Sequence, residues 1–163
     1  MDVEAVYRQY GPMVLRRCRA LLAGEDGAFD AMKDVFVQTL RDPERLLRGV
    51  RSSVLLRATT EVCLVRLRRG ESPPDGPHHD LLLRIAGAGE ATPVRGTLSL
   101  LDWFLSGERA GTDSPGTLAV MLLVDGLTLE ETALEMGTSA NAVRRRLHPL
   151  RERLPELVEV LGA

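Results

Sequence analysis

Residues 125–154, DGLTLEETALEMGTSANAVRRRLHPLRERL, predict two short helices joined by a tight turn. Thr128 can cap the first helix, and Glu131, three positions later, can bond back to it, so that the two residues form a capping box. Gly137 can supply the left-handed backbone with which a chain leaves a helix, and Ser139 can cap the helix that follows. A capped helix, a glycine and a second capped helix in this order are typical of a helix-turn-helix.

The second of these helices has two unlike faces. Val143, Leu147 and Leu150 recur at helical spacing and form an apolar stripe. In a helix-turn-helix the second helix lies in the major groove, where arginine pairs with guanine, asparagine pairs with adenine and further basic groups meet phosphates. The polar residues available for DNA binding are Ser139, Asn141, Arg144, Arg145 and His148.

A basic face can also be only the solvated side of an ordinary helical hairpin. The spacing favours DNA binding, because several constraints are met together. Ala133 is small enough for a close helix crossing, Gly137 follows four positions later, and the apolar Val143 follows six positions after that. We therefore expect DNA binding by this face.

Composition predicts an all-α protein. The 163 residues are 44% hydrophobic, which is typical of a globular chain, and only 4% aromatic. Leucine, arginine, alanine and glutamate abound, and these residues favour helix. The net charge of -2 is unevenly spread, because residues 1–69 carry 13 basic against 9 acidic side chains. A weakly acidic net charge does not exclude binding to nucleic acid, since the electrostatic field at a phosphate depends on the charges of the surface that it meets.

The sequence shows no sign of catalytic or metal chemistry. Cys18 and Cys63 have no partners at metal-ligand spacing and are predicted to be small buried hydrophobes in a reducing cytoplasm. His78 and His79 are predicted loop residues. No phosphate-binding glycine loop or activated nucleophile is recognisable, so we expect neither an enzyme nor a cofactor. The longest apolar run, 118–124, is far shorter than the roughly 20 residues of a membrane span.

The remaining pattern predicts two small helical domains. Helices are expected before and after a break at Gly11-Pro12, and then over 28–40, 51–69, 97–105 and 117–124. Residues 70–93 are rich in glycine and proline, with one apolar patch at 81–85, and are predicted to be a linker. The domains would then be 1–69 and 94–163, with Trp103 in the core of the second and a kink or helix end near Pro149.

The chain resembles the extracytoplasmic-function sigma factors, short bacterial initiation factors in which a linker joins a promoter-melting domain to a helix-turn-helix domain. VDGLTLEETALEMGTSANAVRRRL (124–147) matches the family's glycine, double-acid, small-residue, glycine, serine and valine pattern. LRRCRALLAGEDGAFDAMKDVF (15–36) and LLRATTEVCLVRLRR (55–69) are similar to segments of the family's first domain. The resemblance implies binding to promoter DNA and to core RNA polymerase, the latter through Asp30, Lys33 and Asp34, and a possible anti-sigma partner.

The first domain departs from the family at positions that matter for promoter opening. Residues unlike those of the family stand at Phe29, Lys33, Val54, Glu61 and Val65. In the family the groups around the long helix help to hold separated bases by stacking or in pockets. The resemblance therefore implies a sigma-like initiation factor with a degenerate melting domain. The alternative is a sigma-derived interaction module that sequesters polymerase or a regulatory partner without initiating transcription.

Overall fold

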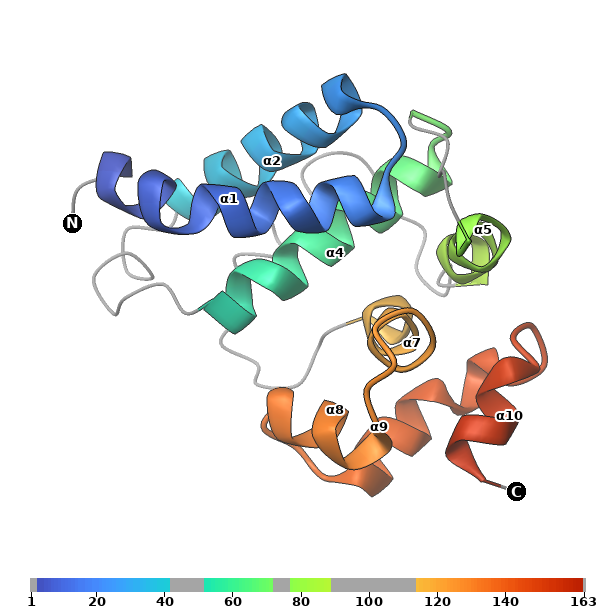
Figure 1. The fold of residues 1–163 in the computed structure, drawn as a ribbon. Helices are drawn as coiled ribbons and strands as arrows, with labels where there is room; N and C mark the ends of the chain where they lie inside the picture. Colours follow the sequence, from blue (N-terminus) through green and yellow to red (C-terminus); the bar gives the residue numbers. More distant parts are fainter. Residues whose placement is uncertain (1–2, 42–51, 72–76, 89–113, 163) are drawn as a thin grey trace.

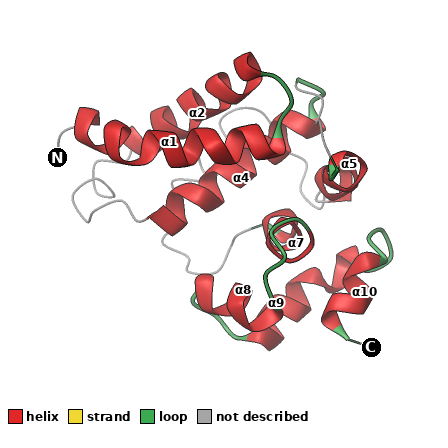
Figure 2. Ribbon diagram, viewed as in Figure 1, coloured by secondary structure: helices red, strands yellow, loops and turns green. Residues whose placement is uncertain are grey.

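The computed structural model describes residues 3–41, 52–71, 77–88 and 114–162, and all regular structure in these ranges is helical (Figures 1 and 2). The prediction of an all-α fold is thus confirmed for the described part of the chain. The α-helices are α1 (Val3–Leu21), α2 (Glu25–Leu40), α4 (Ser52–Arg68), α5 (His79–Ala88), α7 (Pro115–Leu123), α8 (Leu129–Glu135), α9 (Ala140–Leu147) and α10 (Glu156–Leu161).

Helix α1 runs through Pro12, so the predicted break at Gly11-Pro12 is wrong. Proline has no backbone N–H with which to bond the carbonyl of Arg8, and its ring disfavours a helix interior. Here the proline lies on the exposed side, while Val6 and Val14 are buried on the other side. The apolar stripe keeps its helical spacing across the proline, and packing against α2 and α4 outweighs the lost bond.

Helix α2 begins at Glu25, three residues before the predicted start. Gly24 precedes it with a φ of 83°, a left-handed conformation that glycine adopts without steric cost. Glu25 and Asp26 lie in the first turn, where negative charge is stabilised by the positive end of the helix dipole. These two effects offset the presence of Gly27 inside the helix.

Helices α1, α2 and α4 pack against one another, and we call them, together with α5, the front bundle. Helix α1 lies across α2 and α4 in Figure 1. The core between these helices contains fully buried side chains from each of them, including Val14, Cys18, Val35, Leu55 and Cys63.

Helix α5 lies inside the segment predicted to be a linker. Leu82, Ile85 and Ala86 follow helical spacing and are buried, and α5 packs against α4 and α7. Arg68 Nε donates a hydrogen bond of 2.9 Å to the carbonyl of Ala86, which ties the two helices together. The glycine and proline content of 70–93 concealed this short helix, because its stability comes from tertiary packing rather than from local propensity.

Helix α7 is the centre of what we call the rear bundle, α7 to α10. Every residue from Gly116 to Leu122 is buried. The helix contacts α4 and α5 on one side and α8, α9 and α10 on the other, as Figure 1 shows. The other expected apolar helix, 97–105 with Trp103, falls outside the described residues. Among the described helices, none combines the length and apolarity needed to cross a membrane.

Candidate nucleic-acid interface

The capping box predicted at the start of α8 is present. Thr128 Oγ1 accepts a hydrogen bond of 3.1 Å from Glu131 N, and Glu131 Oε2 accepts one of 2.8 Å from Thr128 N. Hydrogen bonds from the backbone N–H and the side chain of Thr128 lower the pKa of the Glu131 carboxyl group. The capping box fixes where α8 begins.

The turn between α8 and α9 has the geometry that its glycine predicts. Gly137 has a φ of 61°, and Thr138 N donates to the carbonyl of Ala133 at 2.9 Å. These features satisfy carbonyl groups at the end of α8 and redirect the chain. Ala133 is 5% exposed, and α8 packs against α9. A small residue at this position therefore lies within the packed core.

Helix α9 starts at a side-chain cap and ends before a proline, as predicted. Ser139 Oγ accepts a hydrogen bond of 3.2 Å from Ala142 N. Val143 and Leu147 are fully buried and face the rear bundle. A 3-10 turn, His148–Leu150, follows α9 directly and contains Pro149, which cannot donate the hydrogen bond that would extend the α-helix.

The opposite face of α9 is open to solvent. The exposed residues on it include Asn141, Arg144, Arg145 and His148. Arg145 makes no hydrogen bond or ion pair within the described residues. Its guanidinium group is thus free to meet an external acceptor, and arginine offers five N–H donors in a fixed plane for that purpose.

Arg144 differs from its neighbour, because the chain already holds it. Its Nε donates to the carbonyl of Leu161 at 3.1 Å, and its Nη1 donates to Asn141 Oδ1 at 3.3 Å. The next carbonyl, that of Gly162, accepts from Arg151 Nη2 at 3.0 Å. The carbonyl groups at the end of α10 therefore fix two arginines beside α9. The sequence pattern gave no signal for this contact, since it joins residues 17 positions apart in different helices.

Ser139 has a structural role that can be measured apart from any contact with DNA. Replacing it by alanine should lower the free energy of unfolding by about 1 kcal/mol, because Ala142 N loses its partner at the helix start. Ser139→Asn should restore most of that stability, since asparagine is an equally good cap. Urea denaturation of the three proteins checks this expectation. Equal midpoints for serine and alanine would show that the cap contributes nothing.

The residues predicted to bind polymerase divide into two groups. Asp30 and Lys33 are exposed on α2 and lie 3.3 Å apart between Oδ1 and Nζ. Asp34 instead joins α2 to α4, with its Oδ2 2.5 Å from Arg66 Nη2. Burial alone would lower the pKa of Arg66, but the hydrogen bond and the charge of Asp34 outweigh it and raise that pKa. Asp34 therefore also helps to hold α2 and α4 together in the front bundle.

The described residues contain no group of three or more His, Cys, Asp or Glu side chains that could hold a metal ion. The histidine predicted to lie in a loop at position 79 is instead the first residue of α5. Cys18 and Cys63 are unpaired by any disulfide and are both fully buried. The hydrogen bond between their thiols lowers the pKa of Cys18, and the same bond together with burial raises that of Cys63.

No model of a known protein family matches the chain. A search of curated proteins likewise finds no match.

Proposed function

We propose that this protein is a sigma-like transcription initiation factor that binds promoter DNA through α9 and core RNA polymerase through α2. The observation that carries the proposal is the division of α9 into a fully buried apolar side and an exposed basic side. Val143 and Leu147 pack α9 against the other helices of the rear bundle, so that Asn141 and Arg145 project from the molecule. A helix held in this way can enter a major groove without giving up its own packing.

The polar side chains of this face suit the chemistry of DNA. Arg145 can donate two parallel hydrogen bonds to the O6 and N7 atoms of guanine, and Asn141 can pair with adenine in the same manner. His148, directly after α9, can reach a phosphate or a base edge. Arg144, held by Leu161, has further N–H groups with which to meet a phosphate.

The α2 surface supports the polymerase half of the proposal. Asp30 and Lys33 are exposed, and the apolar Phe29 and Val37 beside them are 40% and 47% exposed. Charged groups with neighbouring apolar side chains provide both steering and burial in a protein interface. These positions also lie in the segment that resembles the polymerase-binding segment of the sigma family.

One observation favours a second candidate, a sigma-derived interaction module that sequesters polymerase or a regulatory partner without initiating transcription. Three consecutive polar residues of α4, Thr59, Thr60 and Glu61, make hydrogen bonds inside the protein. Thr59 donates to the carbonyl of Leu55 at 2.6 Å, and Thr60 binds Arg17. Glu61 is 8% exposed, and its carboxylate binds the start of α7. In this arrangement these three side chains are not available to hold separated strands.

A filter-binding titration against promoter fragments tests the DNA half of the proposal. If α9 and its neighbours meet phosphates, the logarithm of the association constant should fall linearly with the logarithm of the salt concentration. The slope should be about -0.9 for each phosphate contacted. The absence of DNA binding at low salt, together with retained copurification with core polymerase, would favour the second candidate. The absence of both activities would reject the sigma-like function.

A further inference from the structure

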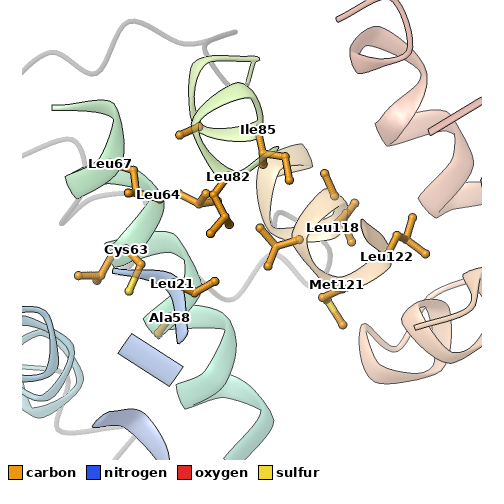
Figure 3. Packing of buried hydrophobic residues seen from close by; sticks show 14 of the residues in the cluster. Leu21, Ala58, Cys63, Leu64, Leu67, Leu82, Ile85, Leu118, Met121 and Leu122 are labelled. Atoms are coloured by element: carbon orange, nitrogen blue, oxygen red, sulfur yellow. The ribbon is translucent and has the colours of Figure 1, made fainter. Parts of the chain in front are cut away.

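The front and rear bundles meet at an apolar surface. Leu64 of α4, Leu82 and Ile85 of α5, and Leu118 of α7 converge there, as Figure 3 shows. The side chain of Leu64 packs closely on the backbone of α7 at Gly116, where an added Cβ would lie 3.1 Å from Leu64 Cδ1. The contact is thus tight at its centre and depends on a glycine in α7.

One arginine of the front bundle holds the turn that leads into α8. Arg17 Nη2 lies 2.7 Å from Asp125 Oδ2, and its Nη1 bonds the other carboxylate oxygen, so that the pair is bidentate. The same guanidinium group donates to Thr60 Oγ1 from Nε at 3.2 Å and from Nη2 at 3.1 Å. The side chains of Arg17 and Asp125 are only 16% and 24% exposed. Residues 108 positions apart are therefore joined by a paired, charge-assisted contact between the two bundles.

Within the described residues, further polar contacts join the two bundles. The Glu61 carboxylate of α4 accepts from Ser114 N at 3.2 Å and from the hydroxyl groups of Ser114 and Thr117 at the start of α7. Arg84 of α5 pairs with Glu156 of α10, with Nη1 3.1 Å from Oε2. At the end of α8, Arg57 Nη1 lies 3.6 Å from the sulfur of Met136.

We propose that Arg17, Asp125 and Thr60 form a lock that keeps the rear bundle closed against the front bundle, and that breaking the lock lets the two bundles separate. Apolar contacts accompanied by polar ones are also found between domains of one chain, and such interfaces resemble transient protein–protein interfaces. Residues 89–113 connect α5 to α7 along the sequence, so the separated bundles would remain tethered. Asp125 lies in the segment between α7 and α8, and the lock thereby fixes the position of α8 and α9 relative to the front bundle.

The lock has a consequence that rests on the proposed function. In the closed state the exposed faces of α2 and α9 are held at one fixed spacing. Only an assembly with that same spacing can engage both faces at once, because bivalent binding requires a geometry that lets both sites be filled. Release of the lock would allow other spacings.

Single-molecule energy transfer tests the lock without DNA or polymerase. Dyes are attached at Asp26→Cys on α2 and Glu159→Cys on α10, two exposed positions, while the native cysteines are fully buried. Arg17→Ala and Asp125→Asn should each raise the ratio of open to closed molecules on the order of tenfold. The double variant should open no further than either single variant, since both substitutions remove the same contact.

The matched control is Arg19→Ala, which removes an arginine of the same helix whose partner, Glu25, lies within the front bundle. If Arg17→Ala and Asp125→Asn give the transfer efficiency of this control, the lock does not exist. If their effects multiply in the double variant, the two side chains do not act together and the lock is likewise rejected. Should Arg17→Ala lose helicity by circular dichroism, Asp125→Asn, in the turn before α8, decides alone. Failure of the wild-type protein to bind promoter DNA in the filter-binding titration would reject the proposed function. That outcome would leave the energy-transfer results unaffected.

Discussion

Replacing both Arg144 and Arg145 by alanine should nearly abolish promoter binding, with a loss of about 1 to 3 kcal/mol for each arginine. Both guanidinium groups lie on the exposed side of α9, opposite the buried Val143 and Leu147. Arginines at base edges or phosphates supply hydrogen bonds that water cannot replace once the groove is filled. Filter binding with promoter fragments and with an unrelated duplex measures the loss.

The single substitutions should differ in a way that the contacts explain. Arg145→Ala should weaken DNA binding and leave the melting temperature unchanged, because Arg145 bonds to nothing within the described residues. Arg144→Ala should weaken DNA binding and also lower stability, by about 0.5 to 1.5 kcal/mol, because the carbonyl of Leu161 loses its donor.

Arg16→Ala provides the control, since Arg16 is an exposed arginine on α1, in the front bundle. It removes the same charge from the molecule and should change DNA affinity little. If the α9 variants bind DNA as tightly as wild type, the exposed face of α9 faces solvent and does not contact DNA. If Arg16→Ala weakens binding equally, net charge rather than the α9 surface governs the affinity.

The local features of the fold could be predicted from the sequence because each depends on residues a few positions apart. Thr128 with Glu131, and Ser139 with Ala142, satisfy N–H groups within one helical turn. Gly137 and Pro149 act through their own backbone restrictions. These signals also give the exposed face of α9, because a cap and an apolar stripe together determine which side of a helix is buried.

Features that depend on distant contacts could not be predicted. Pro12 was expected to end a helix, but packing of α1 against α2 and α4 keeps the helix continuous. Helix α5 was expected to be linker, and its Leu82 is buried only because α4 and α7 are adjacent. The partners of Asp34 and Arg144 lie 32 and 17 positions away, and no spacing rule connects them.

Leu118→Ala should have the largest effect on stability, a loss of about 2 to 5 kcal/mol in the free energy of unfolding. Leu118 is fully buried in α7, the rear-bundle helix that also contacts α4 and α5 of the front bundle. Its removal takes away contacts with the surrounding side chains and leaves a cavity that they fill only in part. A small protein with a total stability of about 5 to 15 kcal/mol has little reserve against such a change.

Leu134→Ala is the matched control, because Leu134 of α8 is 82% exposed and the same atoms are removed. It should change stability by less than about 0.5 kcal/mol.

Hydrogen exchange then distinguishes a core shared by the two bundles from two independent cores. Since α7 packs on α4 and α5 as well as on α9, Leu118→Ala should reduce amide protection in α4 and in α9 together. If protection falls in α9 alone and α4 keeps the wild-type value, the bundles are stabilised separately, and the apolar surface between them contributes little to the fold.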